Sequence, residues 1–129
     1  MKMPLPPETE ALAKQTVDAA MKVHRALGPG LLESVYEKCL THELRIREIV
    51  VQAQVNVPVV YEGLRLESGL RLDLLIDKQL IVEIKAVEEM SRLFKAQVLT
   101  YLRLTNLRLA LLINFNVPLL RDGIHRVIL

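Results

Sequence analysis

Acidic side chains interrupt two neighbouring apolar runs of the chain. Asp73 lies within residues 70–76, and Glu83 and Lys85 lie within residues 80–86. A carboxylate inside a sheet loses hydration, so it persists only where a cation, a metal ion or hydrogen-bond donors offset that loss. Asp73, Glu83 and Lys85 are therefore candidate residues of a site.

The two runs are close enough to form one hairpin. A loop of residues 77–79 places Leu74 opposite Val82, and the same loop places Asp73 opposite Glu83, because cross-strand partners share a face. A two-residue loop would place Glu83 opposite Leu74, since a slip of one residue inverts the side-chain pattern. We therefore predict the three-residue loop, with both carboxylates on one face.

The rest of the sequence predicts the elements that would position this hairpin. Apolar residues recur at helical spacing over residues 8–27 and 31–47. The second helix has a buried stripe that includes Tyr36. Strands are predicted over 50–61, 107–115 and 123–129, and a third helix, capped by Ser91, over 92–104. The order α-α-β-β-β-α-β-β predicts an α/β fold with a mixed β-sheet.

Length and composition favour one domain. The chain has 129 residues and is 51% hydrophobic, so we expect a flexible N-terminal tail over 1–7 and a single domain over 8–129. No apolar stretch approaches the roughly 20 residues that span a bilayer, and the start lacks a signal peptide's apolar region. We expect a cytoplasmic protein with no membrane partner. Cys39 is the only cysteine, which excludes an internal disulfide.

The formal charge of +2 and the pI near 8.8 permit a polyanionic partner without requiring one. A solvated surface is the alternative explanation for the basic residues. The arginines that could form a phosphate-binding rim are Arg45, Arg47, Arg65, Arg71, Arg103, Arg108, Arg121 and Arg126.

Three motifs carry a family resemblance. The first motif is an aspartate, Asp73, followed after nine residues by Glu83 and after one more residue by Lys85. Asp73 lies on one predicted strand of the hairpin, Glu83 and Lys85 lie on the next strand, and a helix follows. This arrangement resembles the core of the PD-(D/E)XK nuclease superfamily. The segment Gly30-Leu31-Leu32-Glu33-Ser34-Val35-Tyr36 resembles the signature of the GxxExxY proteins in that superfamily, and Gln97-Val98-Leu99-Thr100-Tyr101 resembles its Q-x-x-x-Y element. Departures from the family pattern occur at Glu48, Leu72 and Asn116.

The resemblance implies a restriction-endonuclease-like core, with the mixed β-sheet flanked by helices, and metal-dependent hydrolysis of phosphodiester bonds in nucleic acid, DNA more than RNA. Its implied cofactor is Mg²⁺ or Mn²⁺, held by Asp73, Glu83 and Glu33. The implied catalytic residues are Glu33, Asp73, Glu83, Lys85 and Gln97, and the implied substrate contacts are Gly30, Tyr36 and Tyr101.

Alternatives remain open for the motifs and for the whole protein. Glu33 could merely complement the positive end of its helix, and Gln97 with Tyr101 could be a helix-face pair. The protein could be a non-catalytic nucleic-acid-binding or regulatory module of the same fold, because fold alone does not establish activity. It could also be a structural homo-oligomer with carboxylates in interface ion pairs, and a homodimer is a further expectation.

Overall fold

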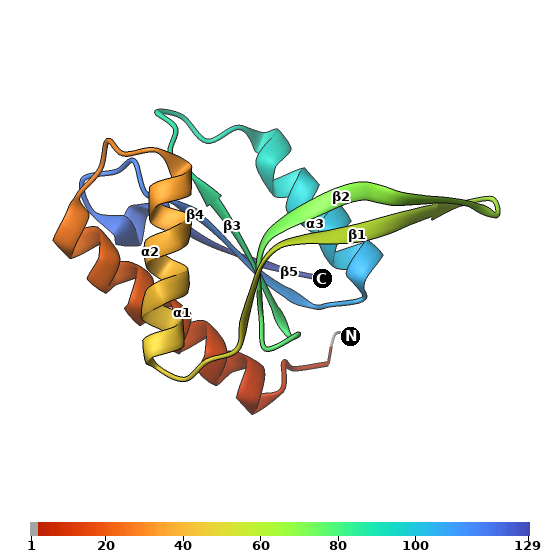
Figure 1. Cartoon of the computed structure of the whole chain (residues 1–129), viewed down its shortest axis with the longest axis horizontal. Helices are drawn as coiled ribbons and strands as arrows, with labels where there is room; N and C mark the ends of the chain where they lie inside the picture. The colour runs from red at the N-terminus through yellow and green to blue at the C-terminus, as the bar shows by residue number, and fades with distance from the viewer. Residues whose placement is uncertain (1–2) are drawn as a thin grey trace.

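The computed structural model describes residues 3–129, and Figure 1 traces their path. The order of elements confirms the predicted α/β arrangement. The elements are α1 (Pro7–Leu27), α2 (Glu33–Ile46), β1 (Val51–Tyr61), β2 (Leu64–Ile76), β3 (Leu80–Lys85), α3 (Arg92–Thr105), β4 (Leu109–Asn114), the 3₁₀ helix η1 (Leu120–Gly123) and β5 (Ile124–Ile128).

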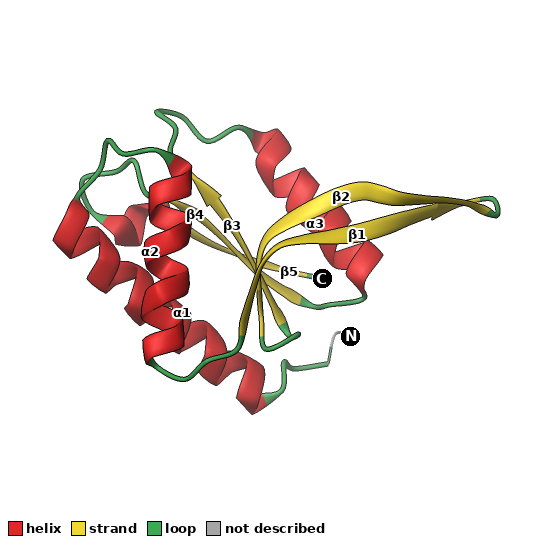
Figure 2. Ribbon diagram, viewed as in Figure 1, coloured by secondary structure: helices red, strands yellow, loops and turns green. Residues whose placement is uncertain are grey.

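The five strands form one mixed sheet in the order β1-β2-β3-β4-β5. Strands β3 and β4 are parallel, whereas the other neighbours are antiparallel. A parallel pair needs a crossover connection, and α3 supplies it. The sheet therefore lies between α1 and α2 on one side and α3 on the other (Figure 2).

Each face of the sheet has its own hydrophobic core. The core under α1 and α2 includes Tyr36, Leu40 and Phe115, and the core under α3 includes Ile81 and Leu102. All six residues of β4 are buried, as its apolar run predicts for a strand covered on both faces. The predicted cap of α3 is confirmed, because the Ser91 hydroxyl accepts a hydrogen bond from Leu93 N–H at 3.1 Å.

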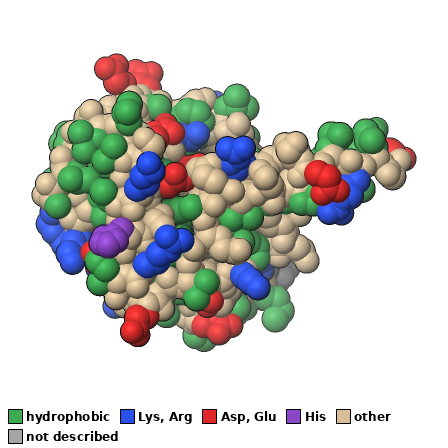
Figure 3. Space-filling view, in the orientation of Figure 1, with side chains coloured by type: hydrophobic (Ala, Val, Ile, Leu, Met, Phe, Trp, Pro, Cys, Tyr) green, Lys and Arg blue, Asp and Glu red, His purple; other side chains and the backbone are tan. Residues whose placement is uncertain are grey.

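The β1–β2 hairpin is longer than the sequence predicts and projects from the body of the molecule (Figures 1 and 3). Strand β2 begins at Leu64 rather than at residue 70, after a turn at Glu62 and Gly63 with φ of 47° and 82°. The Ser-Gly step at 68–69 weakens the alternation of polar and apolar residues there, so the outer half of β2 has no clear strand pattern.

The predicted tail falls partly outside the described residues, which exclude residues 1 and 2. Of the remainder, the Arg108 guanidinium donates hydrogen bonds to the carbonyls of Met3 at 2.6 Å and Pro4 at 3.2 Å. Pro7 already belongs to α1. Within residues 3–129, no helix combines the length and apolarity that a membrane crossing requires.

Candidate active site

Asp73 and Glu83 lie side by side where the β2–β3 ladder ends; we call them the acid pair. The Asp73 main-chain N–H donates to Glu83 Oε1 at 2.9 Å, and the Ile84 N–H donates to Asp73 Oδ2 at 2.8 Å. Each carboxylate therefore has one oxygen anchored to the main chain of the neighbouring strand. The predicted register is confirmed by the pairs Leu74–Val82, Leu75–Ile81 and Ile76–Leu80.

Both strands of the long hairpin change faces at the level of Asp73. Leu74 packs in the core under α1 and α2, but Leu72 packs in the core under α3, although residues two apart share a face in a regular strand. Val51 and Val55 are divided in the same way. Between them Gln54, opposite Asp73, has a φ of 54°, in the left-handed region. This rotation interrupts the regular sheet at the acid pair.

Glu83 has an unfavourable environment for its negative charge. The residue is 6% exposed. Burial raises its pKa most, the charge of Asp73 raises it further, and the result is about 8. The Asp73 N–H and the Lys85 ammonium favour the ionised form but do not offset these effects. Ionisation of Glu83 beside Asp73 is therefore disfavoured in the metal-free protein, and a bound cation would stabilise the ionised pair.

Lys85 lies beside the acid pair without forming an ion pair to it. Its position two residues after Glu83 places both side chains on the α3 face of β3. The Lys85 Nζ lies over the Phe94 ring, 4.3 Å from the centroid, and none of the salt bridges within residues 3–129 involves Lys85. Its ammonium is therefore available for an anionic group near the acid pair.

An acidic hollow of about 270 Å³ opens on the other side of Asp73. Glu33, Glu37, Gln54 and Asp73 contribute to its wall. The Gln54 amide donates to Glu37 Oε1. Burial raises the pKa of Glu37, and the charges of Asp73 and Glu33 raise it further, while the Gln54 hydrogen bond lowers it. Sequence reasoning missed Glu37, although its i,i+4 spacing from Glu33 placed it on the same helix face.

A family model described as the PD-(D/E)XK nuclease superfamily matches residues 10–127. The chain belongs to this superfamily. No curated protein and no solved structure matched the chain. The mixed sheet with helices on both faces is thus the restriction-endonuclease-like core that the sequence predicted.

PD-(D/E)XK nucleases typically use divalent metal ions, and the acid pair fits such an ion. Its carboxylates are hard oxygen donors, and Mg²⁺ is usually held by one or two carboxylates together with water and substrate phosphate. Glu33 does not complete a closed set: its Oε1 accepts from Ala86 N–H at 3.3 Å, and no group of three His, Cys, Asp or Glu within residues 3–129 has a metal-binding arrangement. Convergence of Glu33 with the acid pair is therefore not observed.

The two residues of the Q-x-x-x-Y element lie on α3, but in different environments. Burial raises the pKa of Tyr101, and the charges of Glu83 and Asp73 raise it further. Gln97 is exposed and forms no side-chain hydrogen bond within the described part of the chain. The roles of both residues toward substrate remain predictions.

The predicted substrate contact at Tyr36 is wrong as a direct contact, because its side chain is fully buried. The Tyr36 ring stacks on Phe115 with 4.5 Å between centroids. Its hydroxyl donates to Gly28 O at 2.6 Å and accepts from Leu31 N–H at 3.1 Å. Tyr36 therefore holds the loop of residues 28–32, while Gly30 is exposed in that loop with a φ of 98°.

The predicted arginine rim is largely used within the protein. Arg45 and Arg108 donate to main-chain carbonyls, and Arg103 donates to Thr100 Oγ1. Glutamates pair with the arginines at 47, 65 and 126. Of the eight arginines, Arg71 and Arg121 make no side-chain hydrogen bond or ion pair within residues 3–129.

Proposed function

We propose that this protein is a metal-dependent nuclease of the GxxExxY branch, which hydrolyses phosphodiester bonds of nucleic acid, DNA more than RNA. The observation that carries this proposal is the acid pair, in which Glu83 is buried and Asp73 half-buried, anchored through main-chain N–H groups with Lys85 beside it. Membership in a nuclease superfamily supports the same function.

Asp73 and Glu83 would hold Mg²⁺ or Mn²⁺ through their unanchored oxygens. Such an ion supplies Lewis-acid stabilisation of phosphate charge and lowers the pKa of bound water. Lys85, free of an ion pair, would stabilise negative charge on the phosphate as it is attacked. Glu33 and Glu37 on the wall of the acidic hollow would orient water there through their carboxylate oxygens.

On α3, Gln97 and Tyr101 would face the substrate, and main-chain amides near Gly30 would approach its phosphate backbone. The charges of Glu83 and Asp73 act on the pKa of Tyr101, and Gly30 is exposed in the loop that leads into α2. Neither Gln97 nor Tyr101 is required to bind the cation in this arrangement.

A non-catalytic nucleic-acid-binding module is the second candidate. The observation in its favour is that two carboxylates, rather than three, are arranged together, while Glu33 is engaged with Ala86 N–H. A binding module would bind oligonucleotides with similar affinity in the presence and absence of the cation.

The test is a cleavage panel of labelled single- and double-stranded DNA and RNA with Mg²⁺ or Mn²⁺. The parent and the control variant Lys14→Ala, which removes an exposed lysine of α1, should cleave the same substrate equally. Lys85→Ala should lose about 100-fold or more in rate, as expected for a charge-stabilising group, and should keep its metal-induced rise in melting temperature. Equal cleavage by Lys85→Ala would remove Lys85 from the mechanism, and binding without any cleavage would establish the non-catalytic module.

A further inference from the structure

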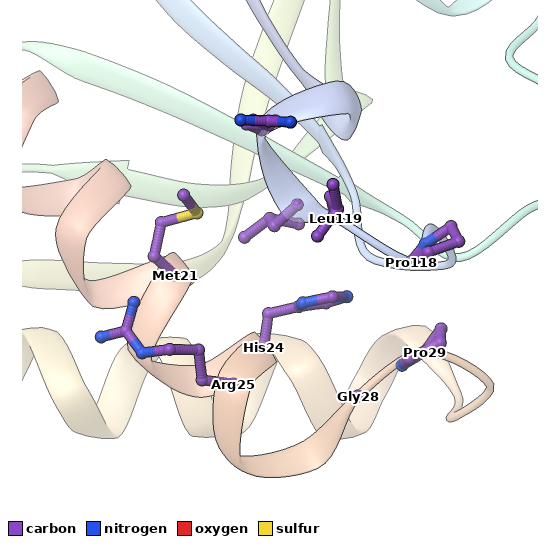
Figure 4. Close-up of a pocket in the computed structure, with 9 residues that line it drawn as sticks. Met21, His24, Arg25, Gly28, Pro29, Pro118 and Leu119 are labelled. Atoms are coloured by element: carbon purple, nitrogen blue, oxygen red, sulfur yellow. The ribbon is translucent and has the colours of Figure 1, made fainter.

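A second cavity lies away from the acid pair, between the end of α1 and the segment that follows β4 (Figure 4). Its volume is about 540 Å³, within the range of small-molecule sites. None of its lining residues borders the acidic hollow. Apolar walls come from Met21, Pro29, Pro118 and Leu119.

Two arginines on this cavity have no counter-charge. Arg25 lies in the last turn of α1, and Arg121 lies in η1. Neither forms a hydrogen bond or an ion pair through its guanidinium within residues 3–129, whereas Arg47 and Arg126 each pair with a glutamate. Two uncompensated guanidinium groups on one cavity favour an anion, and phosphate oxygens match their planar donor geometry.

His24 adds a polar group to the cavity. The residue is 7% exposed, and its Nε2 lies 2.9 Å from the Val117 carbonyl oxygen, to which it donates. The other ring nitrogen, Nδ1, has no hydrogen-bond partner in the described residues. It is nevertheless not one of their fully buried unpartnered atoms, of which Thr41 Oγ1 is the only one, so it is accessible. Figure 4 shows the His24 ring directed toward Pro29 and Pro118. That nitrogen can therefore form a hydrogen bond with a ligand in the cavity.

From this arrangement we infer that the cavity binds a nucleoside monophosphate unit. The phosphate would lie against Arg25 and Arg121, and the base would lie against the apolar walls, with His24 forming a hydrogen bond to the base or sugar. Inorganic phosphate alone would leave those walls without a contact, and a purely apolar ligand would leave both guanidinium groups unpaired.

The cavity is linked to the acidic hollow through one loop. Gly28 and Pro29 border the cavity, and the loop continues to Glu33 in the acidic hollow. Tyr36 fixes this loop through the Gly28 carbonyl and the Leu31 N–H. Residues 28–32 therefore connect the two sites along the chain, although no residue lines both of them.

Binding is measured by calorimetry in chelator, so that the acid pair holds no cation. The probes are inorganic phosphate, adenosine monophosphate, and a short oligonucleotide with or without a 5′-phosphate. Adenosine monophosphate should bind at least tenfold more tightly than phosphate. The double variant Arg25→Ala with Arg121→Ala should weaken it at least tenfold, while the charge-matched control Lys14→Ala with Arg103→Ala should stay within twofold of the parent.

His24→Gln retains a donor toward the Val117 carbonyl. This variant should bind adenosine monophosphate several-fold more weakly than the parent, with unchanged affinity for phosphate. Competition by the 5′-phosphorylated oligonucleotide alone would identify a strand terminus as the source of the unit, and no competition by either oligonucleotide would identify a free nucleotide. Equal affinity for phosphate and adenosine monophosphate, absence of saturable binding, or loss of binding in Lys85→Ala but not in the arginine variant would each overturn the inference. Because no step requires cleavage, an inactive nuclease does not affect this test.

Discussion

Glu43 and Glu83 are buried to nearly the same extent, at 8% and 6% exposure, in opposite electrostatic environments. Glu43 accepts a hydrogen bond from Arg47 Nε at 3.0 Å and lies 3.2 Å from Lys22 Nζ, and these groups lower its pKa. Glu83 forms no ion pair within residues 3–129, so burial and the neighbouring charge of Asp73 raise its pKa. The protein itself compensates the charge of Glu43, whereas the ionised form of Glu83 would need a bound cation to compensate its charge. A carboxylate of the second kind indicates a functional site.

The largest expected effect of this contrast is on stability without metal. Glu83→Gln should stabilise the metal-free protein by about 3 kcal/mol at pH 7, because each unit of raised pKa corresponds to about 1.36 kcal/mol. The amide still accepts from the Asp73 N–H and can donate to the Asp73 carboxylate. Glu43→Gln should destabilise the protein, because Lys22 and Arg47 lose their counter-charge. Urea unfolding in chelator measures the free energy of unfolding of both variants. Destabilisation by Glu83→Gln would show that the environment of Glu83 does not disfavour its charge.

The same contrast predicts two pH windows. Glu83 has a folded pKa near 8, above its usual value of 4.5, so the folded state binds more protons. Stability should therefore fall as pH rises from about 5 to 8, by up to about 1.4 kcal/mol per unit. Glu43 has a lowered pKa, so its stabilisation is present above pH 4.5 and is lost as pH falls below that value. Unfolding curves at pH 3 to 9 should show both changes in stability. If the fall in stability between pH 5 and 8 persists in Glu83→Gln, a group other than Glu83 causes it.

A smaller effect on stability is expected at Tyr36, whose role is structural, whereas we propose that the acid pair acts in cleavage. Tyr36→Phe should cost about 1–3 kcal/mol of stability, because Gly28 O and Leu31 N–H lose a buried partner. Cleavage per folded molecule should persist at reduced rate, since the hydroxyl does not reach substrate. Tyr61→Phe is the matched control, because Tyr61 is 71% exposed and should change stability by less than about 0.5 kcal/mol. A full loss of cleavage with unchanged stability would return Tyr36 to the substrate contacts.

The sequence was sufficient wherever local pattern and pairing agree. The acid pair and its register followed from placing polar side chains opposite polar ones across a loop at 77–79. The structure has this loop without glycine, since Asp77 and Lys78 adopt φ of 46° and 56°. Tyr36 was predicted both as part of a buried stripe and as a substrate contact, and the helical periodicity was the better guide to its position.

Other features depend on contacts between distant segments. The rotation at Gln54 has no local signal, because glutamine rarely adopts a positive φ and no glycine marks the position. Glu37 joins the acidic hollow only when β1 and β2 meet α2. Glu48 has a φ of 61°, so the backbone of this turn has the left-handed conformation that glycine favours although the residue is a glutamate.

The most direct test of the cation site at the acid pair is a set of melting curves for the parent and Asp73→Asn, each with Mn²⁺ and with chelator. We expect Mn²⁺ at about 100 times its dissociation constant to add roughly 2.7 kcal/mol to the parent, a rise of roughly 10 °C. Asp73→Asn should match or exceed the parent in chelator and should not respond to Mn²⁺. If Mn²⁺ shifts neither protein and Asp73→Asn loses several kcal/mol in chelator, Asp73 is a structural residue and the acid pair is not a cation site.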